Sequence, residues 1–272
     1  MSDTHRREPV EPTRPPESSA RVLILSGYGI NAERELADAF AEAGGAPEVR
    51  HVSDVVANPE VIADYAIVGF PGGFSFGDHL GSGKALAAII RAHLLPALSG
   101  LVARGGLIIG ICNGFQVLVK SGLLPNTAGD ARQEVTLVHN DSGRFINRWV
   151  RCAVNPAASA AWLAGLDQID LPIRHGEGRF LFGDEEIRSR LQQTNCIALR
   201  YVGGNPNGSQ DNVAGICDPT GRILGLMPHP EAFRANHHHP HWTRGPVSGP
   251  TGLTIFQNGV RAAGKLHTSA NL

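Results

Sequence analysis

Short apolar runs recur through the first half of the chain, and segments of helical periodicity lie between them. Three of these runs predict strands: residues 21–26, 47–52 and 64–70. Leu36, Phe40 and Ala43 share one face of a predicted helix, which we expect Asn31 to cap and Gly44 to end. Strands that are apolar on both faces and alternate with helices are typical of a parallel sheet covered on both sides.

After residue 125 the pattern changes to short strand-like runs separated by turn clusters. The runs that predict strands are residues 134–139, 145–154, 171–174, 196–202, 213–217 and 222–227. The last two runs flank the turn sequence Asp218-Pro219-Thr220-Gly221 and predict a hairpin. The expected helices are residues 84–104, with an interruption near Pro96, and residues 184–192 and 252–263.

This order of elements predicts an α/β fold: an open, mainly parallel sheet with helices on both faces and an additional antiparallel strand region. We find no internal repeat and no linker, so we expect residues 21–272 to form a single domain. Residues 1–20 are polar and rich in proline, which predicts a disordered tail; an arm that binds a partner is the less favoured alternative.

The composition excludes several classes of protein. A net charge of −1 gives no support for binding nucleic acid or an anionic membrane. The apolar runs are shorter than the roughly 20 residues of a membrane span, and the N-terminus does not have the pattern of a signal peptide. The four cysteines are scattered without a C-x-x-C pair, which argues against a disulfide framework or a zinc site and favours a reducing, cytoplasmic location.

Residues 106–116 join a strand pattern to a helix pattern with almost no loop between them. The joint reads Gly110-x-Cys112-x-Gly114, a nucleophile-elbow pattern with cysteine in place of serine. At such a turn the helix N-terminus favours a thiolate on Cys112, and the Asn113 N–H points towards an oxyanion on the attacked carbon. From this motif alone, a buried structural cysteine fits about equally well.

A glycine-rich turn, residues 71–78, follows the predicted strand 64–70, at the edge where open α/β sheets place their ligands. Gly73 is a candidate for a second oxyanion N–H donor, although an ordinary turn is the better interpretation of this stretch by itself. The nearby Gly81-Ser82-Gly83-Lys84 fails as a phosphate-binding loop, because the full pattern also requires glycine at position 78 and serine or threonine at position 85. We therefore expect no ATP site in this chain.

A second candidate site, residues 227–231, reads Met-Pro-His-Pro-Glu. Prolines on both sides of His229 favour extended backbone, in which His229 and Glu231 point to the same side. The histidine is then a general base for a thiol, and the glutamate orients its ring. A lone motif of this kind is more often a surface turn, but together with the elbow it predicts a Cys112, His229 and Glu231 triad.

These motifs, in this order, resemble the class I (triad) glutamine amidotransferases. The resemblance rests on the sequence motifs P-G-G-F-S-F-G-D, G-I-C-N-G-F-Q, N-x-S-G-R-F, H-G-E-G-R-F and M-P-H-P-E. Within the class the chain is most similar to the glutaminase subunits of phosphoribosylformylglycinamidine synthase in purine biosynthesis, over about residues 21–265. Two positions depart from the pattern of these subunits: Ala32 stands where a cysteine is common, and Ala232 stands where an arginine is common.

The resemblance implies that Cys112 is the nucleophile, that His229 and Glu231 complete the triad, and that Gly73 and Asn113 supply the oxyanion N–H groups. It also implies that Gln116 contacts bound glutamine and that the chain itself holds no cofactor or metal. The implied partner is a synthetase subunit, which uses ATP and magnesium to convert formylglycinamide ribonucleotide to the amidine. A small bridging subunit is a further component that the resemblance allows.

Two further stretches have alternative interpretations. Residues 237–241 are rich in histidine, and we favour a loop that faces a partner or the substrate over a metal site, since Pro240 breaks the run. Residues 175–179 (H-G-E-G-R) are expected near the glutamine pocket or a subunit interface. Two functional alternatives also remain at this point: an independent cysteine hydrolase, and a catalytically silent regulatory module.

Overall fold

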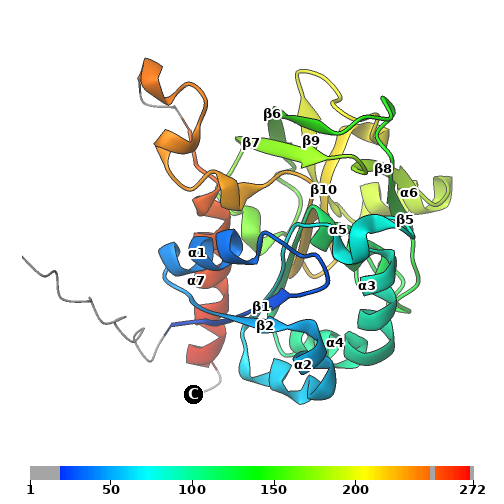
Figure 1. Ribbon diagram of the computed structural model, residues 1–272, viewed down its shortest axis with the longest axis vertical. Coiled ribbons are helices and arrows are strands. Elements are labelled where there is room, and N and C mark those ends of the chain that lie inside the picture. The colour runs from blue at the N-terminus through cyan, green and yellow to red at the C-terminus, as the bar shows by residue number, and fades with distance from the viewer. Residues whose placement is uncertain (1–18, 246–248, 270–272) are drawn as a thin grey trace, which may run out of the picture.

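One nine-stranded mixed sheet runs through the molecule (Figure 1). The computed structural model describes residues 19–245 and 249–269. The strand order is β2-β1-β3-β4-β11-β10-β9-β6-β7. The strands are β1 (Arg21–Ser26), β2 (Ala46–His51), β3 (Ile67–Phe70), β4 (Leu107–Ile111), β6 (Ile146–Val154), β7 (Gln168–His175), β9 (Ile197–Val202), β10 (Val213–Cys217) and β11 (Ile223–Leu226).

The first half of the sheet is parallel, as the continuous apolar runs predict. β1 pairs with β2 and β3, β3 with β4, and β4 with β11, each time in parallel. Every residue of β3, β4 and β11 is buried, because helices cover both faces of these strands. The parallel arrangement also brings the carboxyl ends of β3, β4 and β11 to one edge of the sheet.

The second half of the sheet is antiparallel. β10 and β11 form the predicted hairpin around the Asp218 turn, and β9, β6 and β7 extend the sheet from β10. A separate two-stranded sheet pairs β5 (Val135–Val138) with β8 (Arg179–Phe182). The sequence analysis missed β8, because this strand is short and directly follows the glycines of the 175–179 stretch.

The helices lie on both faces of the sheet, as expected. They are α1 (Glu33–Glu42), α2 (Val52–Ala57), α3 (Lys84–Ile89), α4 (Leu95–Ala103), α5 (Asn113–Ser121), α6 (Glu185–Gln193) and α7 (Leu253–Ser269). Figure 1 shows α1 and α7 on one side of the parallel strands and α3, α4 and α5 on the other. The short 3₁₀ segments include η2 (Ser75–Asp78) and η6 (Pro230–Ala232) next to the site, and η7 (Asn236–His238) and η8 (Trp242–Arg244) in the histidine-rich segment.

The predicted break in the 84–104 helix is real but lies before Pro96. A π-helical segment, η3 (Ile90–Leu94), separates α3 from α4, and Pro96 sits in the first turn of α4, where its missing N–H costs little. Within the described residues, the stretch Lys84–Ala103 is long and apolar enough to cross a membrane by length and composition, contrary to our expectation from the sequence. In this fold α3 packs on α5, and α4 packs on β4.

Two local expectations at the N-terminal end were wrong. The N-cap of α1 is Ala32, without a side-chain cap, because the N–H groups of Asn31 and Ala32 both donate to the Gly72 carbonyl and fix this turn against the glycine-rich loop. The expected tail also ends earlier than residue 20. Ala20 is buried, and its carbonyl accepts a hydrogen bond from Ala46 N–H, whereas residues 1–18 lie outside the described part of the chain.

Candidate active site

Cys112 forms the junction between β4 and α5 in a backbone conformation that L-residues rarely adopt. Its φ and ψ are 50° and −105°, and its N–H donates to the Leu226 carbonyl of the neighbouring strand at 2.9 Å. A Cβ at Gly114 would lie 2.0 Å from the Phe70 carbonyl oxygen, so only glycine lets α5 approach β3 this closely. The strand-to-helix elbow expected from the sequence is therefore present.

His229 reaches Cys112 because β4 and β11 are adjacent parallel strands. Cys112 follows β4, and His229 lies shortly after β11, at the same edge of the sheet. The His229 N–H donates to the Pro172 carbonyl of β7 at 2.8 Å, which anchors this segment. The Cys112 Sγ lies 3.9 Å from the Arg174 carbonyl oxygen, on the same strand β7.

Glu231 orients the His229 ring, although not through the extended backbone that we expected. Pro230 begins the 3₁₀ turn η6, since a fixed proline φ suits the first helical position. Within this turn the Glu231 Oε1 lies 2.6 Å from His229 Nδ1, and both side chains are buried. His229 Nε2 has no hydrogen-bond partner among the described residues, so this nitrogen is available to a proton from Cys112 or a substrate.

The electrostatics of this pair favour a charged imidazole. Burial acts against the charged ring, but the Glu231 carboxylate and the Cys112 sulfur outweigh it and raise the pKa of His229 to about 10. His175 behaves in the opposite way. Burial, together with the neighbouring His229, lowers the pKa of His175 to about 4, so this ring is neutral at physiological pH.

The glycine-rich turn lies beside the elbow. Gly73 has a φ of 153°, and a Cβ there would lie 2.7 Å from Ile30 Cα, so the close pairing of Gly73 with Ile30 requires glycine. This pairing uses the Phe74 N–H and the Gly72 carbonyl, not the Gly73 N–H. The Asn113 side chain ties the turn to α5, because its Oδ1 accepts from the Ser75 N–H at 3.3 Å.

A cavity of about 550 Å³ opens over these groups, and Gly73, Cys112, Gln116 and His229 all line it. Gln116 is buried. Its Oε1 accepts from Asn113 Nδ2 at 3.0 Å, and its Nε2 donates to the Glu177 carbonyl. Its contact with bound glutamine stays a prediction.

The 175–179 stretch borders the same cavity, as expected from the resemblance. His175, Gly176 and Glu177 line it. The buried Asn140 shapes this wall, since its side chain hydrogen-bonds His175 Nδ1 at 3.0 Å and accepts from the Gly178 N–H at 3.1 Å. These contacts therefore join two of the motifs on which the resemblance rests, N-x-S-G-R-F and H-G-E-G-R-F.

Two charged residues of the cavity were not predicted from the sequence. Glu35 of α1 and Arg174 of β7 line it, and Arg174 Nη2 lies 2.8 Å from Glu35 Oε2. Their only sequence signals were a charged residue in the first turn of a predicted helix and one at the end of a predicted strand. Neither signal indicates a contact between residues so far apart in the chain.

The histidine-rich segment does not line this cavity. It projects from the body of the molecule, in orange in Figure 1. His239 packs against Trp149 with ring centroids 4.5 Å apart, and the rings of His237 and His238 meet edge to face with centroids 4.3 Å apart. Among the described residues there is no group of three or more His, Cys, Asp and Glu side chains placed to hold a metal ion. A partner-facing role for this segment stays a prediction.

Comparisons with known proteins agree with this geometry. The family model of the CobB/CobQ-like glutamine amidotransferase domain matches residues 19–261. The phosphoribosylformylglycinamidine synthase subunit PurQ of Dehalococcoides mccartyi is 42% identical over 253 residues, which cover 90% of this chain and 98% of the relative. The phosphoribosylformylglycinamidine synthase of Drosophila melanogaster is 35% identical over 238 residues, which are 81% of this chain and 18% of that longer protein.

A solved structure is similar over nearly the same range. A chain in the structure of PurLQS from Thermotoga maritima matches with a TM-score of 0.70 at 30% sequence identity, covering 89% of this chain and 98% of that chain. The predicted fold class is thus confirmed by both the sheet topology and the structural neighbour. The chain belongs to the glutamine amidotransferase family, among the PurQ-type subunits of phosphoribosylformylglycinamidine synthase.

Proposed function

We propose that this chain hydrolyses glutamine at Cys112 and supplies the ammonia to a synthetase subunit that makes formylglycinamidine ribonucleotide in purine biosynthesis. One observation carries the proposal: Cys112 and His229 line the same cavity, and Glu231 Oε1 lies 2.6 Å from Nδ1 of the His229 ring. A nucleophile, a base and an orienting carboxylate in this order can perform acyl transfer.

In the proposed reaction the Cys112 thiolate attacks the side-chain amide carbon of glutamine. The N–H groups of Gly73 and Asn113 stabilise the negative charge on the amide oxygen, and the His229 imidazolium gives its proton to the leaving ammonia. Neutral His229 then takes a proton from water as its oxygen adds to the thioester carbon. Cleavage of the C–S bond releases glutamate and restores the Cys112 thiolate and the His229 imidazolium. Glu231 keeps Nδ1 protonated, so that Nε2 faces the reacting groups.

The proposed partner is the synthetase subunit, which uses ATP and magnesium. The names of the relatives support this, because the Thermotoga structure is of PurLQS and the Drosophila relative contains the similar region within a longer phosphoribosylformylglycinamidine synthase. A small bridging subunit is a further proposed component. The proposed location is the cytoplasm, where a thiol such as Cys112 stays reduced.

The rim of the cavity is suited to such a partner. Phe74 and Phe145 line the cavity and are 45% and 56% exposed, and Leu80 nearby in sequence is 72% exposed. Tyr28 stacks on Phe76 with centroids 4.5 Å apart, and both rings are more than one third exposed. Exposed apolar side chains around a reaction chamber are expected to be covered when a partner seals the path of ammonia.

The experiment that tests the function is reconstitution with the synthetase subunit from the same organism. We expect glutamine, ATP and formylglycinamide ribonucleotide to give one glutamate for each amidine formed. The chain alone should release glutamate from glutamine and should not cleave peptides. Cleavage of peptides would identify an independent hydrolase instead. If no glutamate is released under either condition, the chain is a silent regulatory module and the proposal is wrong.

A further inference from the structure

Two charged residues from distant parts of the chain form a line of alternating charge that ends at the base. Glu35 Oε2 lies 2.8 Å from Arg174 Nη2, and the same Nη2 lies 3.8 Å from Glu231 Oε1. Glu231 Oε1 is also the atom that contacts His229 Nδ1 at 2.6 Å. One carboxylate oxygen therefore lies between two groups that can both carry positive charge.

The exposure of these groups differs in a way that matters for their roles. The Glu231 side chain is 1% exposed, whereas Arg174 and Glu35 are 37% and 47% exposed. At 3.8 Å the guanidinium of Arg174 is too far for a hydrogen bond to Glu231 but close enough for charge to act. Arg174 Nη2 therefore lies closer to Glu35 than to Glu231, whose Oε1 is within hydrogen-bond distance of the histidine.

We propose that Arg174 and Glu35 are positioning residues that set the charge balance of the Cys112–His229–Glu231 triad. Arg174 opposes a positive charge on His229 and favours a negative charge on Cys112. Glu35 holds Arg174 off Glu231 and partly cancels its charge. This inference rests on the proposed function for its meaning, because it assigns a device for tuning the proposed glutaminase base.

Besides His175, the other titratable groups that line the cavity among the described residues are Asp78, His139 and Glu177. His139 and Glu177 lie 3.7 Å apart, and none of the three forms an ion pair with His229 or Glu231.

Cys112 and Glu231 belong to the triad itself, and His175 from β7 is held neutral by burial. Among the described residues that line the cavity, Arg174 is the one arginine or lysine, so its charge has no duplicate there. The side chains of Arg174 and Glu35 are both more than one third exposed, so we expect their replacement to disturb the packing of the core little.

The test is the pH profile of two variants that alter charge in opposite directions. Arg174→Met keeps the length of the side chain and removes a positive charge, so thiolate formation and loss of the imidazolium proton both move to higher pH. Glu35→Gln removes a negative charge and frees Arg174 to approach Glu231, so both move to lower pH. A single partly screened charge at this range shifts such a profile by about half a pH unit.

Two measurements separate this inference from the proposed function. The first is glutamate release as a function of pH by the reconstituted complex. The second is the pH dependence of Cys112 alkylation by iodoacetamide, followed by mass spectrometry of the Cys112 peptide, which needs no glutamine. If the alkylation profiles shift in opposite directions but no variant hydrolyses glutamine, the inference stands and the proposed function fails.

Asp38→Asn is the matched control, because Asp38 lies on the same helix as Glu35, is 64% exposed and pairs with Arg234 outside the cavity. Asp38→Asn should leave the pH profiles of glutamate release and of Cys112 alkylation unchanged. Arg174→Lys retains the charge, so its profiles should stay close to those of the wild type and lack most of the shift seen in Arg174→Met. Profiles that coincide with the wild type in both test variants, or that shift in the same direction in both, overturn the proposal.

Discussion

At the scale of single residues, the site depends on a backbone strain that the fold retains. Cys112 keeps a positive φ of 50°, and a residue held in such a region costs on the order of 1–3 kcal/mol. The strain persists because β4, β11 and α5 all fix the chain around this residue, through bonds such as Cys112 N–H to the Leu226 carbonyl. This backbone conformation places the thiol of Cys112 at the start of α5, where it lines the cavity.

Replacing Cys112 with alanine should abolish glutamine-dependent activity and leave the fold intact. Alanine keeps the Cβ and loses only the sulfur, so the packing at the elbow changes little. In the reconstituted complex we expect added ammonium to support amidine synthesis at the wild-type rate, measured alongside glutamate release and thermal melting. Glutamine-dependent turnover that survives in this variant would rule out the proposed chemistry.

His229 and Glu231 should differ in how much activity their loss removes. His229→Ala removes both proton transfers, and general acid–base catalysis typically contributes ~10²–10⁴-fold. Glu231→Gln still orients the ring by a hydrogen bond but no longer balances its charge, so we expect a smaller loss in kcat. The measurement is kcat and KM for glutamine in both variants. If both variants hydrolyse glutamine at the wild-type rate, His229 and Glu231 have no catalytic role and only form a turn.

At the scale of elements, the strands and turns that depend on neighbouring residues in the chain could be predicted from the sequence. The buried strands and the β10–β11 hairpin follow from apolar runs and turn residues, which act within a few positions of each other. The start of α1 was wrong because the Gly72 carbonyl, from a different loop, takes the N–H groups of Asn31 and Ala32. β8 was not predicted because this short strand is formed by pairing with β5 and has no clear strand pattern of its own in the sequence.

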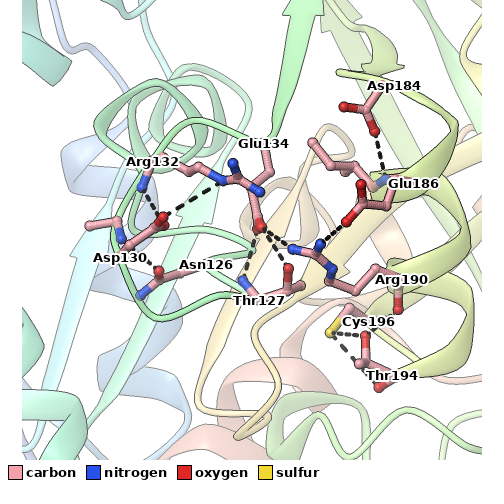
Figure 2. Close-up of polar contacts among 12 residues, drawn as sticks. Asn126, Thr127, Asp130, Arg132, Glu134, Asp184, Glu186, Arg190, Thr194 and Cys196 are labelled. Atoms are coloured by element: carbon pink, nitrogen blue, oxygen red, sulfur yellow. Dashed lines mark hydrogen bonds and ion pairs between the residues drawn. The ribbon is translucent and has the colours of Figure 1, made fainter.

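A buried carboxylate holds the connection between α5 and β5. Glu134 accepts hydrogen bonds from the N–H and the hydroxyl of Thr127, at 2.8 and 2.6 Å, and lies 3.5 Å from Arg190 of α6 (Figure 2). Its side chain is fully buried. Arg190 reaches it from α6 while also pairing with Glu186, so the cluster ties the loop after α5 to α6.

Replacing Glu134 with alanine should destabilise the protein strongly without touching the chemistry. Removing one partner of a buried charged pair typically costs about 3–5 kcal/mol, because the other groups lose their partner. Glu134→Gln should cost less, since its carbonyl oxygen can still accept from Thr127. Chemical denaturation gives the free energy of unfolding, and glutamate release below the unfolding transition gives the activity.

The contact of Arg190 with Glu134 can be separated from its contact with Glu186. Glu186 is 79% exposed, so Glu186→Gln should change stability by about 1 kcal/mol or less. Equal losses in Glu134→Ala and Glu186→Gln would show that the buried cluster does not hold this connection.

At the scale of the whole molecule, the site is assembled from segments that no local pattern connects. The Cys112 elbow and the glycine-rich turn come from the parallel half of the sheet, and Arg174 comes from β7 at the far edge of the antiparallel half. The grouping of Cys112, His229 and Glu231 could be expected from motifs that resemble those of a known family, and its role as a catalytic triad stays a prediction. The line of charge from Glu35 to Glu231 could not be expected, since only the packing of α1 against η6 and of η6 against β7 creates it.

Deleting residues 2–18 should change the thermal stability of the protein little. These residues lie outside the described part of the chain, and their sequence has no apolar pattern that would bury a face. The deletion stops short of Ala20, which is buried and bonded to β2. Thermal melting of the full and shortened chains checks this, and a large drop in Tm would show that the segment packs on the proposed single domain.

The isolated chain should be a weak glutaminase that its synthetase partner activates, because ammonia released without an acceptor wastes glutamine. The loop beside Gly73 offers a means of control. Phe76 and Asp78 both have positive φ values, of 56° and 57°. The ring of Phe74, which lines the cavity, and the ring of Phe76 are both exposed. A strained loop that carries exposed apolar side chains can be reshaped by a partner that covers them.

The required free-energy bias is small. A resting state with the Gly73 N–H turned away, favoured by ~3 kcal/mol, would lower activity roughly a hundredfold, and partner contacts to the Phe74 and Phe76 rings would reverse it. The measurement is glutamate release by the chain alone and then with the synthetase subunit, ATP and formylglycinamide ribonucleotide. Phe74→Ala should weaken this activation, whereas Trp242→Ala, which removes an exposed aromatic ring that does not line the cavity, serves as its control. Equal turnover with and without the partner would contradict the coupling while leaving the chain a glutaminase.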